Sequence, residues 1–193
     1  MPIITVSGHS RKTGKTSVVE GLIAALPECS WTALKISSHR HSGDPFKDCT
    51  VIEETNHDGG NDTSRFLKAG ARRAFWIQAR HIEDAIPAVQ EIINASPYVV
   101  IEGNSVLNFI AADFSILVIN SGVAEFKESA IGILARADAL VLIRAGADHA
   151  EWENLLKSAP KNIPRFETGA PKIFPPALVE LLRSEKVLPS PDI

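Results

Sequence analysis

Cysteines, an excess of either charge and long apolar runs are all scarce in this sequence of 193 residues. Its two cysteines, Cys29 and Cys49, are too few for the disulfide framework of a small secreted domain. The 20 Lys and Arg do not exceed the 23 Asp and Glu, so the chain lacks the overall positive charge of sequence-independent nucleic-acid binders. No apolar run reaches about 18 residues, and no charged-then-apolar leader follows Met1. We therefore expect a cytoplasmic protein that binds neither nucleic acid nor a membrane.

Apolar runs separated by helical patterns indicate the fold class. Hydrophobic residues make up 45% of the chain, which at this length is enough to build a core without a structural metal. The alternation of short β-branched runs with amphipathic stretches predicts βαβ units, and hence a three-layer α/β fold with a mostly parallel sheet. Most runs are apolar throughout, as strands covered on both faces are. The expected strands are residues 3–7, 31–36, 74–78, 98–102, 115–120 and 139–144, and the expected crossover helices are 15–26 and 81–94.

Two stretches interrupt this alternation. Residues 37–61 are polar and rich in Gly and Asp, and we interpret them as one long loop of the functional or mobile kind. Residues 159–193 contain seven of the twelve prolines, and we expect one docked helix at 177–184 with a loose end. Because no internal repeat or low-complexity tract is present, the chain is predicted to be a single domain over residues 1–193.

The strongest chemical signal is GHSRKTGKTS at residues 8–17, between the first expected strand and the first expected helix. A strand, a glycine-containing turn and a helix that begins at Gly-Lys-Thr are typical of a Walker A loop. Backbone N–H groups and the positive end of the helix dipole bind phosphate oxygens there, while Lys15 would reach the terminal phosphates and the Thr16 hydroxyl would coordinate Mg²⁺. The predicted nucleotide-binding residues of the loop are His9, Ser10, Arg11, Lys12, Thr13, Gly14, Lys15, Thr16 and Ser17.

This loop differs from the usual pattern in two ways. Five residues separate Gly8 from Gly14, one more than the motif has, so His9 takes the position of the first glycine. Arg11 and Lys12 are cations where small residues are more usual. They either contact the bound phosphates or are solvated charges at the tip of the loop.

Acidic partners for the metal are expected near this loop. Glu102 ends the apolar run at 98–102, and Gly103 lets the backbone turn sharply after it. Glu102 is therefore predicted to contact the metal or its water, the alternative being a carboxylate that caps a turn. A second pair, Asp62 and Arg65, lies at the start of an expected short helix, and Arg65 could face the nucleotide or a phosphorylated substrate.

Two further polar groups carry weaker signals. His39, His41 and His57 lie with Cys49 in the long loop, but their spacing matches no four-ligand zinc site, and a loop that folds over substrate explains the same polarity. Asp148 follows the last expected strand, where guanine-selective proteins carry an Asn-Lys-x-Asp segment, and it could accept hydrogen bonds from a guanine edge. The choice between GTP and ATP stays open.

Three segments together resemble one family: IITVSGHSRKTGKTS (3–17), DTSRFLKAGA (62–71) and VVIEGNS (99–105). They are similar to the P-loop proteins called molybdopterin-guanine dinucleotide biosynthesis protein B (MobB), with Lys12 where that family usually has a loop glycine. The resemblance implies a P-loop nucleoside triphosphate hydrolase fold, GTP binding with weak GTPase activity, and a dimer. It also implies a role in molybdenum cofactor biosynthesis, beside the nucleotidyltransferase that joins a guanosine nucleotide to molybdopterin. In this chain it places Asp62 and Arg65 near the nucleotide or the pterin phosphate, and makes Glu102 the strand-end acid.

The expected activity is slow, Mg²⁺-dependent hydrolysis. Lys15 and the metal would neutralise phosphate charge, Glu102 would orient the metal or its water, and no side chain would act as a covalent nucleophile. Two alternatives remain open. One is an ATP-dependent small-molecule kinase or ligase in which Arg65 and residues 37–61 hold an anionic acceptor. The other is a regulatory module that binds nucleotide without significant turnover.

Overall fold

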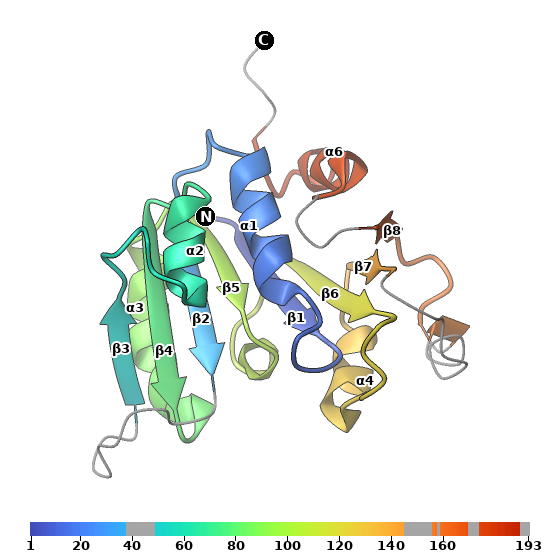
Figure 1. Ribbon diagram of the computed structural model, residues 1–193, viewed down its shortest axis with the longest axis horizontal. Helices are drawn as coiled ribbons and strands as arrows, with labels where there is room; N and C mark the ends of the chain where they lie inside the picture. The colour runs from blue at the N-terminus through green and yellow to red at the C-terminus, as the bar shows by residue number, and fades with distance from the viewer. Residues whose placement is uncertain (38–48, 145–155, 158, 170–173, 190–193) are drawn as a thin grey trace.

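An eight-stranded sheet forms the centre of the computed structural model, which describes residues 1–37, 49–144, 156–157, 159–169 and 174–189 (Figure 1). Its strand order is β3-β4-β2-β5-β1-β6-β7-β8. All neighbouring strands are parallel except β3 and β4, which are antiparallel. The strands are β1 (Ile3–Gly8), β2 (Trp31–Ser37), β3 (Cys49–Glu53), β4 (Arg73–Ala79), β5 (Tyr98–Glu102), β6 (Phe114–Asn120), β7 (Ala139–Ile143) and β8 (Arg165–Thr168).

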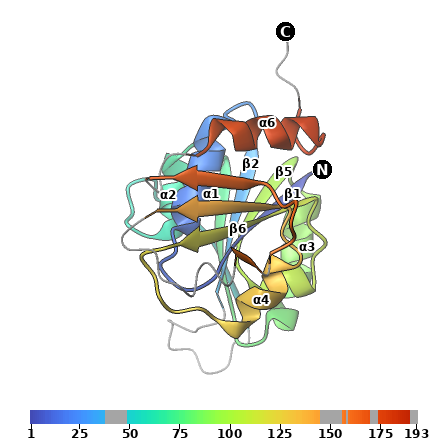
Figure 2. The same cartoon turned by 90° about the vertical axis from the view of Figure 1, so that its right-hand side faces the viewer.

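Helices cover both faces of this sheet. One face carries α1, α2 and α6, and the other carries α3 and α4 (Figures 1 and 2). Two 3₁₀ turns follow the ends of strands. The bounds are α1 (Lys15–Ala25), α2 (Asp62–Lys68), η1 (Ile82–Ala85), α3 (Ile86–Asn94), η2 (Ser105–Asn108), α4 (Glu128–Leu134) and α6 (Pro176–Ser184). The predicted three-layer, mostly parallel α/β fold is confirmed.

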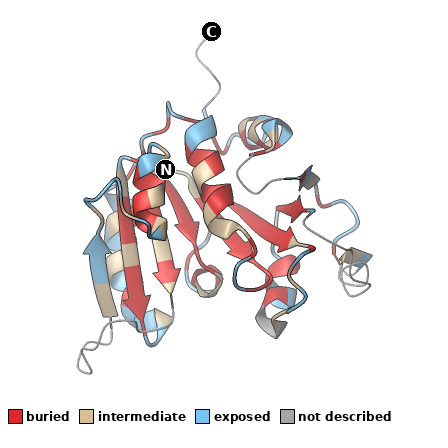
Figure 3. Ribbon diagram, viewed as in Figure 1, coloured by how far each residue is buried: buried red, intermediate tan, exposed pale blue. Residues whose placement is uncertain are grey.

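The two faces bury separate apolar clusters, because successive side chains of a strand point to opposite sides. On the first face Leu22 of α1, Phe66 of α2 and Leu178 of α6 are fully buried. On the second face Val89 and Ile93 of α3 are fully buried against β2, β4 and β5, and α4 packs against β6 and β7. Figure 3 shows the central strands buried along most of their length. This double cover makes the sheet a rigid support for the loops at the carboxyl ends of its strands.

Four expectations about elements need correction. The stretch 37–61 is not one loop, because β3 lies inside it and pairs with β4 at the sheet edge. The tail holds the expected helix, as α6, but also β8, which pairs with β7. The expected helix at 81–94 is divided into η1 and α3, with a proline in the first turn of α3. Helix α4 was not predicted. The two missed strands are short and mostly exposed, so they lack the apolar signal of the inner strands.

Candidate functional site

The loop after β1 lies at the carboxyl edge of the sheet and forms the floor of a cavity of about 870 Å³. The cavity extends from β2 and α2 on one side to η2 and α4 on the other. Seven basic side chains but only two carboxylates line the cavity, and this excess of positive charge favours an anionic ligand. The basic residues are Arg11, Lys12, Lys15, Lys35, Arg65, Lys127 and Arg136, and the carboxylates are Asp62 and Glu102.

The loop has the sharply turned backbone that a phosphate cradle requires. Gly14, the N-cap of α1, has φ 97°, and Lys12 at the tip also has a positive φ, of 57°. Gly8 has no space for a side chain, because a Cβ there would lie 2.4 Å from Thr13 Oγ1. Asn104 fixes the start of the loop: its Oδ1 accepts from the Gly8 N–H at 3.0 Å, and its Nδ2 donates to the Gly8 carbonyl at 2.7 Å.

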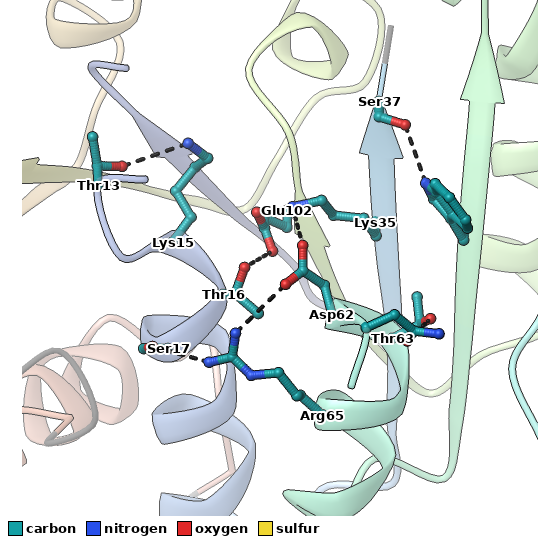
Figure 4. A network of polar contacts seen from close by, with 12 residues as sticks. Thr13, Lys15, Thr16, Ser17, Lys35, Ser37, Asp62, Thr63, Arg65 and Glu102 are labelled. Carbon is teal, nitrogen blue, oxygen red and sulfur yellow. Dashed lines mark hydrogen bonds and ion pairs between the residues drawn. The ribbon is translucent and has the colours of Figure 1, made fainter. Parts of the chain in front are cut away.

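The first turn of α1 is arranged for an anion. No side chain caps its N–H groups, and no acidic residue lies in the first turn. Lys15 folds back over the loop, with its Nζ 2.7 Å from the Ser10 carbonyl and 3.5 Å from Thr13 Oγ1 (Figure 4). Burial lowers the pKa of Lys15, although the charge of Glu102 opposes this shift. A bound phosphate would supply the negative charge that favours the ammonium form.

Glu102 meets the loop as the strand-end acid that the sequence predicted. Its side chain is 2% exposed, and its Oε2 accepts a hydrogen bond from Thr16 Oγ1 at 2.9 Å. Lys35 on β2 pairs with the other oxygen of Glu102, and also with Asp62 Oδ2 at 2.8 Å (Figure 4). Burial opposes the charge on Lys35, but both carboxylates raise its pKa above the ordinary value. Likewise, burial disfavours an ionised Asp62, but Lys35, Thr16 and Arg65 lower its pKa.

These oxygens fit a magnesium ion. The Thr16 hydroxyl and the carboxylates of Glu102 and Asp62 are the hard oxygen ligands that Mg²⁺ prefers, with waters and phosphate oxygens completing its shell. Asp62 was predicted to contact substrate, and the structure places it in the same network as Glu102 and Thr16. Within the described ranges, no group of three His, Cys, Asp or Glu side chains could hold a metal by itself, and His39 and His41 lie outside those ranges.

Arg65 is turned more toward α1 than the sequence suggested. Its Nε and Nη2 donate to Glu20 at 2.9 and 2.5 Å, and Nη2 also donates to Ser17 Oγ at 3.1 Å. A weaker ion pair joins Arg65 to Asp62 at 3.5 Å. Arg65 therefore ties α2 to α1 while lining the cavity, and it holds Asp62 close to Thr16.

The other predicted residues have different positions. Ser10, Arg11, Lys12 and Thr13 line the cavity with the rest of the loop, whereas His9 does not and is fully buried behind it. Asp148 lies outside the described residues, so the structure gives no base contact for it.

Several residues that line the cavity were not among the predicted site residues, among them Lys35, Asn104, Lys127 and Arg136. A lone lysine in the apolar run of β2 was the available signal for Lys35, because a charge near the end of a buried strand needs a partner. Asn104 lies two residues after Glu102, but its contact with Gly8 depends on the pairing of β1 with β5. Lys127 and Arg136 flank the unpredicted helix α4 and had no signal of their own.

No family model and no curated protein matches the chain. Among solved structures it is similar to LpxK from Aquifex aeolicus in complex with ATP, with a TM-score of 0.52 and 18% identity over 86% of this chain and 53% of that one. The chain thus spans about half the length of LpxK. MobB from Bacillus subtilis (TM-score 0.48, 16% identity, 96% and 98% covered) and a MobB homologue from Bacillus stearothermophilus (0.48, 14%, 97% and 100%) are also similar.

At these identities the similarity concerns the fold. No described helix has the length and apolar character needed to cross a membrane. With its mostly parallel sheet, its loop between β1 and α1 and its likeness to LpxK, the chain has the α/β fold of the P-loop NTPases.

Proposed function

We propose that this chain binds a nucleoside triphosphate with Mg²⁺ in the loop of residues 8–17 and hydrolyses it slowly. The observation that carries the proposal is the hydrogen bond between Thr16 and Glu102, 2.9 Å long, at the start of a helix whose first turn lacks any acidic residue. It joins the hydroxyl that follows the loop lysine to a buried strand-end carboxylate, which is the geometry that a phosphate-bound Mg²⁺ requires.

Each residue has a defined task in this proposal. Backbone N–H groups of the loop and the α1 N-terminus bind the phosphates, and Lys15 releases the Ser10 carbonyl to contact them. Glu102 and Thr16 hold the metal shell, with Asp62 beside them. Mg²⁺, when bound, neutralises charge on the transferred phosphoryl group. Lys35 pairs with both carboxylates and orients them, so the chain contributes positioning and charge stabilisation but no covalent nucleophile.

We also propose that the nucleotide is GTP and that the protein assists assembly of the molybdopterin guanine dinucleotide, acting as a homodimer with a nucleotidyltransferase. What supports this is that the three MobB-like segments come together at one site. Thr16 from the first contacts Glu102 from the third, Asp62 from the second joins them through Lys35, and Asn104 from the third holds Gly8 from the first.

The second candidate is an ATP-dependent kinase or ligase that acts on an anionic small molecule. The observation in its favour is that the cavity continues past the loop to Asn108 and Arg136, and at about 870 Å³ it is near the upper limit for a single small-molecule ligand. GTP preference supports the molybdopterin role and ATP preference supports the kinase or ligase.

The deciding experiment is a thermal-shift screen with GTP, ATP, GDP and ADP, each with and without Mg²⁺, followed by measurement of phosphate release. A ligand present at 100 times its Kd stabilises the folded form by about 2.7 kcal/mol, so binding gives a clear rise in Tm. Lys15→Ala should abolish the rise, whereas Lys161→Ala, which removes an exposed lysine away from the cavity, should keep it. Absence of any rise in the unmodified protein would refute the proposal. Binding without phosphate release would indicate a regulatory module.

A further inference from the structure

His9, which takes the position of the first glycine in the phosphate loop, connects the loop to another part of the chain. Its side chain is fully buried, with Nδ1 3.5 Å from the Val118 carbonyl and Nε2 3.2 Å from the Val123 carbonyl. The imidazole also stacks on the ring of Phe126, with centroids 5.7 Å apart and planes at 9°. Its backbone N–H donates to the Val118 carbonyl at 3.3 Å. His9 therefore reaches from the loop to the segment that follows β6.

That segment, residues 121–127, is bound to the loop at two further points. The Lys127 N–H donates to the His9 carbonyl at 3.1 Å, and Ser10 Oγ donates to Glu125 Oε2 at 3.1 Å. The segment ends where α4 begins, and the Lys127 side chain lines the cavity opposite Lys35 and α2. The contacts of residues 123–126 and of the Lys127 N–H with the loop therefore fix where this lysine enters the cavity.

Lys127 faces another cation there. Lys15 and Lys127 line the same cavity, so a ligand bound there can meet both ammonium groups. Among the side chains that the structure describes, no carboxylate forms an ion pair with Lys127, and Glu125 of the same segment accepts from Ser10 instead. A cation that lines the cavity without a carboxylate partner repels the other cations there and favours binding of a polyanion.

We propose that Lys127 is a phosphate-binding residue of this site and that His9 is the residue that positions it. The inference rests on the proposed nucleotide function and adds a second cation to it, supplied by the segment after β6 rather than by the loop itself. In the complex, the phosphate chain lies between Lys15 and Lys127. The histidine at the position of the first glycine then has a function, because a glycine there would lack the side chain that holds residues 121–127.

The first test measures the Kd of Mg²⁺–GTP and Mg²⁺–ATP by calorimetry for the full chain and for Lys127→Met. Loss of one charge-assisted phosphate contact should raise the Kd by roughly tenfold. Lys127→Arg should restore most of the affinity, and Lys161→Met, which removes a lysine away from the cavity, should leave it unchanged. Without nucleotide, Lys127→Met should be at least as stable as the parent, because one repulsive charge is removed. An unchanged Kd in Lys127→Met overturns the proposal.

The second test examines positioning with a double-mutant cycle. His9→Gln should also weaken nucleotide binding, and the double variant His9→Gln/Lys127→Met should bind no more weakly than Lys127→Met, because both changes remove the same contact. If the two effects multiply, His9 does not act through Lys127. Should His9→Gln fail to fold, Phe126→Leu, which removes the stacked ring, takes its place in the cycle.

The outcomes separate this inference from the function beneath it. If the unmodified protein binds neither nucleotide, the proposed function and this inference both fail. If it binds one of them and Lys127→Met binds equally well, only the inference fails.

Discussion

The two sides of the phosphate loop differ in how their charges are balanced. On the side of β2 and α2, Lys35 contacts Glu102 and Asp62, and Arg65 contacts Glu20 and Asp62. On the side of β6 and α4, Lys127 has no ion pair within the described residues, and Arg136 donates to uncharged groups, the Asn108 side chain and the Leu107 carbonyl. In the function proposed above, the first side holds a metal and its water, and the second receives negative charge from a ligand.

Removing Lys35 should have the largest effect, because it breaks the balanced side. Lys35→Met leaves the buried Glu102 without its cation, which should lower the free energy of unfolding by about 3 kcal/mol. Urea denaturation measures this value. The matched control is Arg73→Met, which removes the exposed pair with Glu53 and should cost under about 1 kcal/mol. If both variants lose the same free energy of unfolding, the network around Glu102 stabilises the fold no more than an exposed ion pair does.

Asn104 joins the two sides by fixing the start of the loop. Asn104→Ala removes both hydrogen bonds to Gly8, so stability should fall by about 2 kcal/mol. Triphosphate affinity should fall as well, because the start of the phosphate loop is no longer held by these two hydrogen bonds. Asn94→Ala removes a single exposed hydrogen bond, from Gln90 in α3, and should change neither quantity measurably. Unaltered affinity in Asn104→Ala would mean that β1 alone holds the loop.

Mild acid should destabilise the fold through the buried His9. Burial lowers the pKa of His9 below the ordinary value of 6.5, since the neighbouring carbonyls compensate only in part. The unfolded chain therefore takes up a proton before the folded one does, and the stability linked to neutral His9 is present above pH 6.5 and is lost as the pH falls below it. The loss cannot exceed about 1.4 kcal/mol per pH unit for one proton. Chemical denaturation from pH 7.5 to pH 5 should show a steeper fall for the parent than for His9→Gln, and parallel curves would contradict this account.

The smallest expected effect lies on the α4 wall of the cavity. A Cβ at Gly132 would meet nothing within 4 Å, so Gly132→Ala in α4 should raise the free energy of unfolding by up to about 1 kcal/mol through helix propensity. Gly8→Ala serves as the contrasting variant, because its Cβ would lie 2.4 Å from Thr13 Oγ1 and should displace the loop. Thermal unfolding in the presence of nucleotide tests both variants. A destabilised Gly132→Ala would show that this wall is packed more tightly than the structure indicates.

The parts of the fold that could be predicted from sequence are those with a strong local signal. The six inner parallel strands are apolar runs, and the loop before α1 combines a glycine, a lysine and a hydroxyl at fixed spacing. β3 and β8 lie at the two edges and have mostly exposed side chains, so only pairing with β4 and β7 makes them strands. A pattern read along the chain does not contain that pairing.

The same distinction applies to the site. Lys15, Thr16 and Glu102 could be assigned because each belongs to a motif or to the end of a strand. Lys35 and Asn104 could not, because their partners lie 67 and 96 residues away in the chain. His9 was placed in the loop correctly, but its ring points to residues 118–126 and not to the cavity, which only the pairing of β1 with β6 determines.

The left-handed backbone at Lys12 lowers the stability of the free protein. The left-handed conformation costs a residue with a Cβ roughly 1 to 2 kcal/mol, whereas it costs a glycine almost nothing. With a lysine at this position, the free protein carries a conformational cost that Lys12→Gly would remove. Residues at functional sites often lower the stability of the free protein in return for ligand binding or activity. Lys12→Gly should therefore raise the free energy of unfolding of the free protein and remove one positive charge from the cavity.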